Sequence, residues 1–404
     1  MGLRLFWAAA GLLAYTYVVF PCLVLLRAAL RRVPYRTDAI TPRVSLLIAA
    51  YNEADSIDAK LTNSLELDYP PDRFEIVVAS DGSTDGTTEI VERRSDPRVT
   101  LLSLPRQGKA AALEAAVAAS TGEILVFSDA NSVYAPDAIR ALVRPFADPS
   151  VGGVAGNQRY RSEADADGTA EGERAYWNMD RVLKEAESRA GSTISATGAI
   201  YAIRRILFDG VPVGVTDDFA VSTAVVEKGY RLVFAPDAVA WETVASTGKS
   251  EWGRKVRVMT RGLRGVYERR RLLDPRRYGF YAIQLLSHKL LRRLMSVPLL
   301  VMFVVSPGLW HRGSLYRLAA VVQVITYGLG IVGLVVRKRP LGRHPILATP
   351  GFFLLVNAAA LNATWNVIRG RRIDRWEPVR SQSATGRDGR DGGEVGATAA
   401  GERR

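Results

Sequence analysis

Four short clusters of oxygen-bearing side chains in the central part of the chain could act on a charged ligand. They are AYNE (50–53), SDGSTDGT (80–87), SDAN (128–131) and VTDD (215–218). Any one of them is ordinary turn or helix-capping sequence. Carboxylates that gather at one place, however, need a cation or protons to be tolerated. A divalent metal with oxygen ligands that holds a diphosphate is the simplest chemistry that the four clusters predict together.

A candidate cation for the same ligand lies in the segment RQGKAAALEAA (106–116). This segment is not a P-loop, because a single Gly precedes its Lys and the GxxxxGK[ST] pattern is absent. Lys109 stands where a helix is expected to begin, and a helix N-terminus carries partial positive charge. We therefore expect Lys109 to meet a diphosphate, the alternative being a solvated surface lysine.

Short apolar runs precede the clusters and have the character of strands that are buried on both faces. They are VSLLIA (44–49), FEIVVAS (74–80), VTLLS (99–103), EILVF (123–127) and VGGVAG (151–156). Helical stretches separate these runs, which predicts an α/β fold with a mostly parallel sheet. Ligands of such folds bind at the carboxyl ends of the strands, where the clusters lie.

The central region, residues 44–250, lacks both histidine and cysteine, since His288, His311, His344 and Cys22 all lie outside it. A zinc site and a Ser/His/Asp triad are therefore excluded there. The one cysteine of the chain also excludes an intrachain disulfide.

The formal net charge of +13 is unevenly distributed. Residues 44–250 hold 20 basic and 31 acidic residues, a net of −11, so the two flanks together carry +24. A nucleic-acid binder would be basic over its folded domain, so we expect no nucleic-acid partner. The flanks are where contact with a lipid bilayer is expected.

Leu5 to Leu26 is an uncharged, mostly apolar run that is long enough to cross a bilayer as a helix. Four arginines follow it, Arg27, Arg31, Arg32 and Arg36, and such flanks mark the cytoplasmic side. This predicts a helix that delivers the central region to the cytosol. A cleaved signal peptide is the alternative, but the apolar run is too long and lacks a good cleavage site.

Three further apolar stretches, about Leu294–Trp310, Leu318–Val336 and Ile346–Ile368, also predict membrane spans, the first being marginal in length. The basic loop Arg337–His344 would face the cytosol. A third span would then place the following arginines outside, against the positive-inside tendency. Either one late segment is re-entrant or interfacial, or these charges are an exception.

Taken together, these residues resemble the family 2 glycosyltransferases, in particular the membrane-bound bacterial enzymes that build exopolysaccharides and are related to cellulose and hyaluronan synthases. The resemblance covers roughly residues 44–264 and rests on ordered motifs: VSLLIAAYNE, VVASDGSTDGT, GKAAALEAA, FSDAN, SATGAIYAIRR (195–205) and TDDF (216–219). It implies an α/β GT-A (Rossmann-like nucleotide-sugar-binding) domain with flanking transmembrane helices. It also implies a nucleotide-diphosphate-sugar donor, usually a UDP-sugar, and inversion at the anomeric carbon.

The resemblance assigns roles on the donor side. Tyr51 and Glu53 would line the nucleotide pocket, Asp81 would contact the nucleobase and Lys109 would approach the donor phosphates. Asp129 and Asn131 occupy the Asp-x-Asp positions, at which Mg²⁺ or Mn²⁺ bridges the diphosphate. Asn131 is a neutral oxygen ligand, so the metal site would have one charge fewer than usual.

The TDD motif matches the Thr-Glu-Asp motif of the family, with Asp217 in place of Glu and Asp218 at the position of the catalytic base. An acceptor hydroxyl is a poor nucleophile, so the reaction needs a positioned carboxylate to remove its proton. Helix capping is the alternative role for both aspartates, and Asp217 in particular could have no other.

On the acceptor side, Thr197 and Gly198 could shape the acceptor pocket. Processive relatives carry Gln-x-x-Arg-Trp where this chain has RKVRV (254–258). Arg254 thus replaces Gln beside the acceptor, Arg257 is kept as a diphosphate contact, and Val258 replaces the Trp that stacks on the terminal sugar. This departure puts processive synthesis in doubt.

We therefore expect five parts along the chain. They are an N-terminal transmembrane helix with a basic linker (1–43), a cytosolic GT-A domain (44–250), basic amphipathic interfacial helices (251–293), about three transmembrane helices (294–368) and a basic, disordered tail (369–404). The interfacial assignment rests on FYAIQLLSHKLLRRL (280–294), for which a solvated surface helix is the alternative.

The function expected is that of a multi-pass inner-membrane enzyme with its catalytic domain in the cytosol, which extends a polysaccharide or a lipid-linked acceptor. Other exopolysaccharide assembly proteins are possible partners. One alternative is transfer of a single sugar to a small lipid, such as a polyprenyl phosphate or a glycerolipid. The other is a non-catalytic export scaffold, against which the retained Asp81, Asp129 and Asp218 argue.

Overall fold

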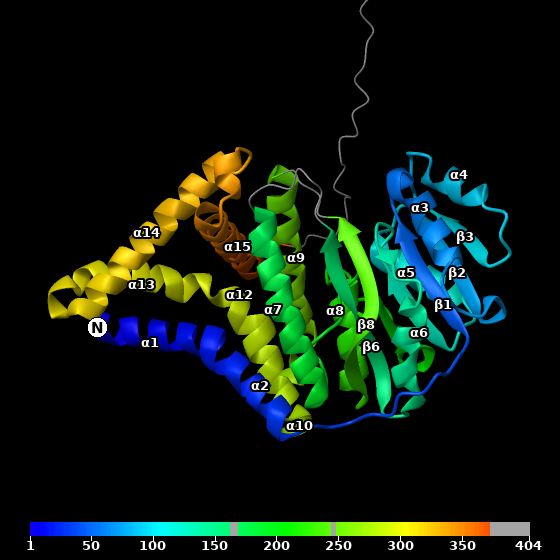
Figure 1. The fold of residues 1–404 in the computed structure, drawn as a ribbon, viewed down its shortest axis with the longest axis horizontal. Coiled ribbons are helices and arrows are strands. Elements are labelled where there is room, and N and C mark those ends of the chain that lie inside the picture. The colour runs from blue at the N-terminus through cyan, green and yellow to red at the C-terminus, as the bar shows by residue number, and fades with distance from the viewer. Residues whose placement is uncertain (162–168, 244–247, 372–404) are drawn as a thin grey trace, which may run out of the picture.

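A computed structural model of the chain describes residues 1–161, 169–243 and 248–371 (Figure 1). The expected disordered tail therefore lies almost wholly outside the described residues. Within them, an eight-stranded sheet has the order β3-β2-β1-β4-β7-β6-β8-β5. The strands are β1 (Val44–Ala50), β2 (Phe74–Asp81), β3 (Val99–Leu104), β4 (Ile124–Ser128), β5 (Val133–Tyr134), β6 (Val151–Arg161), β7 (Tyr201–Arg204) and β8 (Arg231–Thr243).

All five predicted strands are present, as β1, β2, β3, β4 and β6. β1 pairs in parallel with β2 and β4, and β2 pairs in parallel with β3. β7 runs antiparallel to both β4 and β6. The sheet is therefore mixed rather than mostly parallel, because the short β7, which had not been predicted, enters between two predicted strands. The predicted α/β fold class is confirmed.

Helices cover both faces of the sheet, as the full burial of β1 requires. They are α3 (Ala54–Leu65), α4 (Thr87–Glu92), α5 (Lys109–Ala119), α6 (Ala138–Val143) and α8 (Asp217–Glu227). Successive residues of a strand point to opposite faces. Leu46 of β1 accordingly lies in the core layer of α3 and α6, whereas its neighbour Leu47 lies in the layer of α5 and α8.

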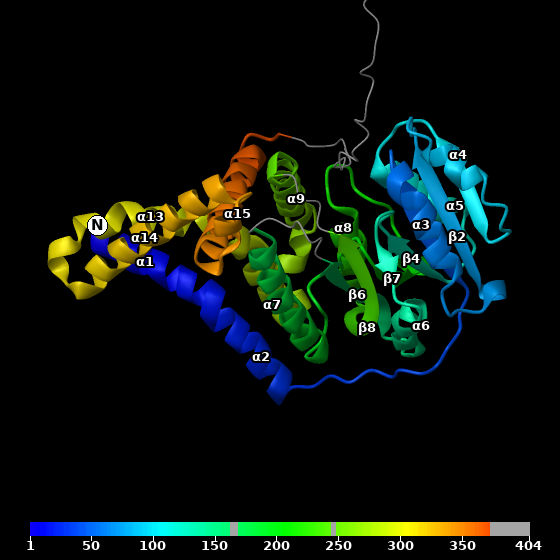
Figure 2. The same ribbon diagram turned by 45° about the horizontal axis from the view of Figure 1, so that its top comes forward.

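Two long helices, α7 (Thr169–Arg189) and α9 (Gly248–Glu268), stand between the sheet and the apolar helices of the two ends (Figures 1 and 2). By length and composition, three helices among the described residues could cross a membrane: Gly2–Leu30, α14 (Ser314–Val336) and α15 (Pro345–Ile368). The first consists of α1 (Gly2–Ala14), a π-helical stretch (Tyr15–Val19) and α2 (Phe20–Leu30). These three match three of the predicted apolar spans.

The remaining predicted span, the marginal one, is α13 (Ser296–Gly308). It is long enough to cross a membrane only together with the segment before it. That segment, Phe280–Leu294, is joined to α13 with a bend of 50°. It contains α11 (Phe280–Gln284), a π-helical stretch (Leu285–Leu291) and α12 (Arg292–Leu294), and it follows α10 (Pro275–Tyr278). A broken span and a re-entrant loop both fit this geometry.

The segment 280–294, predicted as an interfacial helix, packs against α7. His288 is buried, and its ring nitrogens lie 2.9 Å from Oε1 of Glu187 and 3.0 Å from Oδ1 of Asp180. The contact at the bilayer surface stays a prediction. Short 3₁₀ turns complete the described elements: Pro71–Arg73, Arg144–Ala147, Arg205–Leu207, Arg270–Leu273, Trp310–Arg312 and Pro340–Arg343.

Candidate active site

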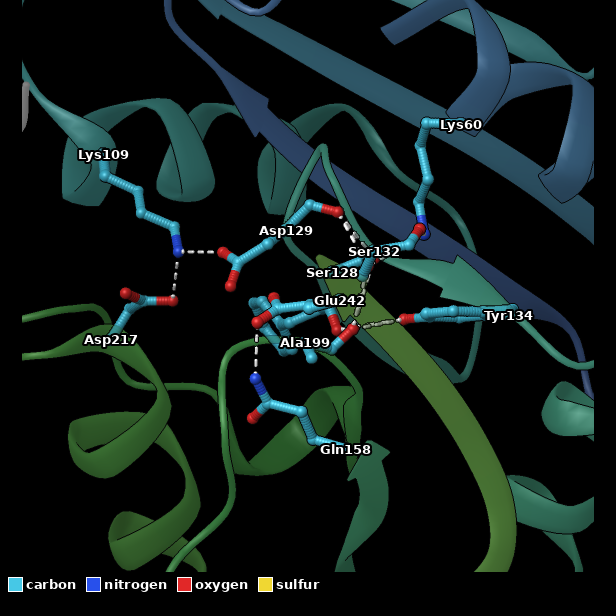
Figure 3. A network of polar contacts seen from close by, with 11 residues as sticks. Lys60, Lys109, Ser128, Asp129, Ser132, Tyr134, Gln158, Ala199, Asp217 and Glu242 are labelled. Carbon is cyan, nitrogen blue, oxygen red and sulfur yellow. Dashed lines mark hydrogen bonds and ion pairs between the residues drawn. The ribbon is translucent and has the colours of Figure 1, made fainter. Parts of the chain in front are cut away.

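Lys109 joins two of the predicted clusters at the carboxyl end of the parallel strands (Figure 3). Its Nζ lies 2.7 Å from Oδ1 of Asp129, which follows β4, and 3.1 Å from Oδ2 of Asp217. Lys109 and Asp217 are each the first residue of a helix, α5 and α8. Helix N-termini thus place both side chains at the rim where ligands of α/β folds bind.

The ammonium group of Lys109 balances the two carboxylates. Burial alone would lower the pKa of Lys109, but the charges of Asp129 and Asp217 outweigh it and raise that pKa above its ordinary value. Lys109 is therefore a fixed cation. The carboxylate of Asp217 forms this ion pair with Lys109. Helix capping is therefore not the only role of Asp217.

Asp218 lies beside this ion pair, in the first turn of α8. Burial and, second, the neighbouring carboxylate of Asp217 raise the pKa of Asp218 above its ordinary value. The charge of Lys109 opposes this shift. A partly buried carboxylate whose proton affinity is increased has the property that a general base needs.

Gly198 lies directly against Asp129. A Cβ atom on Gly198 would lie 2.7 Å from Oδ2 of Asp129, closer than such contacts are found. The absence of a side chain at residue 198 thus leaves the room that this carboxylate occupies. Next to it, Oγ1 of Thr197 is buried and has no hydrogen-bond partner in the described part of the chain. Of the three predicted acceptor-side residues, the structure thus places Gly198 against the Asp129 carboxylate, with Thr197 preceding it in the chain.

The residues around Asp129 fit a divalent cation that takes most of its ligands from water and substrate phosphates and few from the protein. The Asp129 side chain is 33% exposed, and Asn131 is exposed on the following turn. No group of three His, Cys, Asp or Glu side chains that could hold a metal exists among the described residues. Mg²⁺ commonly binds through one or two carboxylates plus substrate phosphates, so a single carboxylate and an amide oxygen suffice here.

Glu53 and Tyr51 lie just beyond the end of β1. Burial raises the pKa of Glu53 to about 7, although a hydrogen bond from Oγ of Ser56, 2.9 Å long, opposes the shift. The backbone N–H of Glu53 donates to Oγ1 of Thr87 in the second cluster, at 2.8 Å. The ends of β1 and β2 are therefore tied together by this hydrogen bond.

Asp81, the last residue of β2, faces the loop before Lys109. Its Oδ1 accepts hydrogen bonds from the backbone N–H groups of Gln107, at 2.7 Å, and Gly108, at 3.0 Å. Its Oδ2 accepts from Gly108 and from the guanidinium of Arg106. That guanidinium lies 3.5 Å from the centroid of the Tyr51 ring. Asp81 thus holds in place the loop that carries Lys109.

Residues 45–211 match the sequence profile described as "Glycosyl transferase family 2". The chain contains a glycosyltransferase family 2 domain. The matched residues include every predicted donor-side and metal-site residue from Tyr51 to Asn131, and also Thr197 and Gly198. Asp217, Asp218 and the arginines of α9 lie beyond them.

Relatives of the family 2 domain include the poly-beta-1,6-N-acetyl-D-glucosamine synthases of Staphylococcus aureus and Staphylococcus epidermidis. The S. aureus (strain MSSA476) protein is 28% identical over 223 residues, which cover 53% of this chain and 53% of the relative. The S. epidermidis protein is 29% identical over 222 residues, with the same coverage. The chain thus matches about half the length of these curated relatives.

A solved structure is similar over more of the chain. The mannosyltransferase PcManGT from Pyrobaculum calidifontis, in complex with GDP-Man and Mn²⁺, has 27% sequence identity and a TM-score of 0.69. The likeness covers 91% of this chain and 100% of that chain. The family 2 domain and this likeness confirm the predicted GT-A fold, and the likeness extends into the flanking helices.

Arg254 and Arg257 are partly exposed on α9, three residues and thus about one helical turn apart. The positive charge of Arg254 opposes the upward shift of the pKa of Glu242. Arg254 therefore lies at the edge of the site. Val258, for which the resemblance predicted the position of a sugar-stacking Trp, is 45% exposed. The three residues therefore lie on one accessible stretch of α9.

Glu242 is a residue of the site that sequence reasoning missed. It lies near the end of β8 and accepts a hydrogen bond from Nε2 of Gln158 on β6 (Figure 3). Burial and, second, the charge of Asp129 raise the pKa of Glu242 to about 7. Its place near a strand end was the available signal, but no acidic cluster marked it.

Lys60 was also missed, and it braces the turn after Asp129. It is 1% exposed, and its Nζ donates to the carbonyl oxygen of Ser132 at 2.8 Å and to its Oγ at 3.2 Å. The same Nζ lies 3.8 Å from the centroid of the Tyr134 ring. Burial lowers the pKa of Lys60 to about 7. The hydrogen bonds from Lys60 to Ser132 thus hold in place the turn that carries Asp129 and Asn131.

Proposed function

We propose that the protein is a membrane-bound inverting glycosyltransferase that transfers a sugar from a nucleotide-diphosphate sugar to a polysaccharide or lipid-linked acceptor. The observation that carries the proposal is the contact of Lys109 with Asp129 and Asp217. It gathers three motifs of the family at one rim of the sheet. The poly-N-acetylglucosamine synthases among the relatives support a hexosyl or N-acetylhexosaminyl group as the one transferred.

Asp218 is the proposed base. Its carboxylate takes the proton of the acceptor hydroxyl while that oxygen attacks C1 of the donor sugar. The bond between C1 and the diphosphate oxygen breaks on the opposite face, and the nucleoside diphosphate leaves with the bonding electrons. One new glycosidic bond replaces one glycosyl phosphate bond, with inverted configuration.

Lys109 is the proposed partner of the leaving diphosphate, because its fixed charge lies at the N-terminus of α5 and both favour an anion. Asp129 and Asn131 would hold Mg²⁺ or Mn²⁺, which would neutralise negative charge on the diphosphate when bound. Arg257 is a further candidate for the diphosphate, and Tyr51, Glu53 and Asp81 for the nucleotide end of the pocket. Thr197, Gly198 and Arg254 are the candidates for the acceptor.

The proposed location is the inner membrane, with the family 2 domain on the cytosolic side. The three candidate spans support membrane attachment. The arginines that follow α2 support the orientation, because basic residues favour the cytosolic side. Assembly proteins of an exopolysaccharide pathway are possible partners in this setting.

A second candidate function is the addition of one sugar to a membrane lipid. The exposed Val258 favours it, because this residue offers no aromatic ring on which the terminal sugar of a growing chain could stack. The two functions differ in the size of the product and share the donor site.

A donor panel with product sizing tests both candidates. Membranes that contain the protein are incubated with labelled UDP-, GDP- and dTDP-sugars, with and without Mn²⁺, and the products are separated by size and by solubility in organic solvent. Metal-dependent incorporation that Asp218→Asn abolishes is expected. A long polymer would support polysaccharide synthesis, a short lipid-soluble product would support the second candidate, and no incorporation from any donor would contradict both.

A further inference from the structure

The segment 192–198 carries Gly198 to Asp129 but belongs to no helix or strand. Residues 193–196 within it are buried. A buried backbone needs partners for its N–H and C=O groups, and outside regular structure these partners must come from other elements. The elements that supply them therefore set the place of this segment beside the site.

Two side chains hold Ile194, which is fully buried at the middle of the segment. Its backbone N–H donates to Oε2 of Glu187, near the end of α7, over 3.0 Å. Its carbonyl oxygen accepts from the hydroxyl group of Tyr281 in α11, over 2.8 Å. Nε2 of Gln284, also in α11, donates to the carbonyl oxygen of Ser192 over 3.3 Å. Side chains from α7 and α11 thus fix the segment.

The other end of the segment is bonded to the helix of the proposed base. The N–H of Ala196 donates to Oγ of Ser222 in α8, over 3.0 Å. That hydroxyl group donates in turn to the carbonyl oxygen of Asp218, over 2.6 Å. The ion pairs of Lys109, by contrast, do not involve the segment. A shift of the segment should therefore disturb the base and the acceptor side more than the donor site.

His288 fixes the orientation of Glu187, whose side chain is fully buried. Nδ1 of His288 lies 2.9 Å from Oε1 of Glu187, and Nε2 of the same ring lies 3.0 Å from Oδ1 of Asp180. Nζ of Lys184 lies 3.2 Å from the other oxygen of Asp180. An imidazole ring bonded at both nitrogens cannot turn without breaking a buried hydrogen bond. The second oxygen of Glu187 is thereby held towards Ile194.

The stretch around His288 also contacts the N-terminal candidate span. The hydroxyl groups of Ser287 and Tyr15 lie 2.8 Å apart. The guanidinium of Arg27 lies 4.5 Å from the centroid of the Phe280 ring. α2 itself packs against α7 through an apolar cluster (Figures 1 and 2). Contacts therefore run from an apolar helix of the N-terminus, through α7 and the 280–294 segment, to the edge of the site.

We propose that Glu187 and Tyr281 are positioning residues for transfer and that His288 orients Glu187 for this role. They hold the segment 192–198 in place beside the site and connect it to the apolar helices of the N-terminus. The inference rests on the proposed function. All three residues are buried and act through the backbone of Ile194, so their effect on transfer is indirect.

Two substitutions of Glu187 separate positioning from a general effect on the fold. Glu187→Met removes the hydrogen bonds to Ile194 and His288. Glu187→Gln keeps an oxygen for the N–H of Ile194, and its amide N–H can donate to Nδ1 of a neutral His288. Transfer in membranes is measured against the concentration of the donor that the panel identifies, per amount of folded protein.

We expect Glu187→Met to lower kcat at least about tenfold, as a misplaced catalytic group does, and Glu187→Gln to keep it within about threefold. KM for the donor should stay within about threefold in both variants, because the donor-side residues are unchanged.

Tyr281→Phe is the milder variant, because it removes only the hydroxyl group that holds the carbonyl oxygen of Ile194. Its kcat should fall about threefold to tenfold, as the loss of one neutral hydrogen bond predicts. His288→Phe should match Glu187→Met. The double variant of Glu187 and His288 should lose no more than either single one, because both substitutions break the same contact.

Leu183→Ala is the matched control. Leu183 is 3% exposed on the same helix and packs with Phe20 and Val24 of α2. Its substitution should lower the melting temperature but leave kcat and KM unchanged per amount of folded protein. Hydrogen exchange of the full chain in lipid nanodiscs reports on the segment directly. The amides of 192–198 should exchange faster in Glu187→Met and not in Leu183→Ala.

Three results would overturn the proposal. The first is an unaltered kcat in folded Glu187→Met or, where that variant does not fold, in Tyr281→Phe. The second is an equal loss of kcat in Leu183→Ala. The third is unchanged exchange of the segment in Glu187→Met. A protein that transfers sugar from no donor would instead contradict the proposed function, and the exchange measurement would then decide whether Glu187 holds the segment.

Discussion

Lys109 and Asp129 are 20 residues apart in the sequence, yet Nζ of the first lies 2.7 Å from Oδ1 of the second. The contact joins the start of α5 to the end of β4, and Asp217 completes it from α8. One cation thus balances carboxylates from two separate motifs. This arrangement makes one prediction for stability and another for catalysis, and a second substitution separates them.

Lys109→Met should abolish transfer and also destabilise the fold. The variant leaves Asp129 and Asp217 facing each other without a cation, which should lower the free energy of unfolding by about 1–3 kcal/mol. Adding Asp217→Asn should restore much of this stability, because one of the two repelling charges is gone, but should not restore transfer. Denaturant unfolding and a transfer assay on the unaltered protein and the two variants measure both effects. Transfer at the unaltered rate in Lys109→Met would contradict the role of Lys109.

Gly198→Ala should reduce transfer strongly, because the new Cβ would lie 2.7 Å from Oδ2 of Asp129 and would push this carboxylate aside. We expect a loss of at least about tenfold, in line with the cost of a misplaced catalytic group. Gly253→Ala is the matched control, since a Cβ at that helical position meets no atom within 4 Å. Equal activity of the two variants would remove Gly198 from the site.

Asn131→Asp should tighten metal binding, because it adds a second negative oxygen ligand beside Asp129. The Mn²⁺ concentration for half-maximal activity should fall several-fold, as expected for one extra charged ligand. Removal of metal with EDTA should abolish the activity of both proteins, and added Mn²⁺ should restore it. An unchanged Mn²⁺ requirement in the variant would place Asn131 outside the metal site.

The transfer rate should fall as the pH decreases through the pKa of Asp218. The base acts in its ionised form, and burial and Asp217 raise this pKa above the ordinary value of about 4. Asp217→Asn removes one cause of the shift, so its acidic limb should move to lower pH. Asp237→Asn, a substitution at an exposed residue of β8, is the control. Profiles of log(kcat/KM) against pH show the shift, and identical limbs in all three proteins would exclude Asp218 as the titrating group.

The fold and the motif residues of the site could be predicted because local sequence determines them. Runs such as VSLLIA are apolar at all positions but one, as expected of a strand buried on both faces, and polar residues follow where such strands end. The rule that ligands bind at these ends then places Asp129 and Asp217 at one rim. These predictions required no knowledge of side-chain contacts.

The contacts that complete the site depend on tertiary structure and could not be predicted. The sequence around Glu242 gives no sign that β8 brings this residue towards Asp129, because β8 pairs with strands far away in the chain. The same is true of Arg106, whose partner Asp81 precedes it by 25 residues. The short β7 was missed because no turn residue marks the start of the strand within its apolar run and arginines follow the run directly.

Transfer by the Asp218→Asn variant tests the central claim most directly. Donor binding and single-turnover transfer are measured side by side for the unaltered protein and the variant, with the donor that the panel identifies. The account predicts donor affinity within about threefold and a transfer rate reduced roughly a hundredfold to ten-thousandfold, the usual contribution of a general base. Transfer by the variant at the unaltered rate would contradict it.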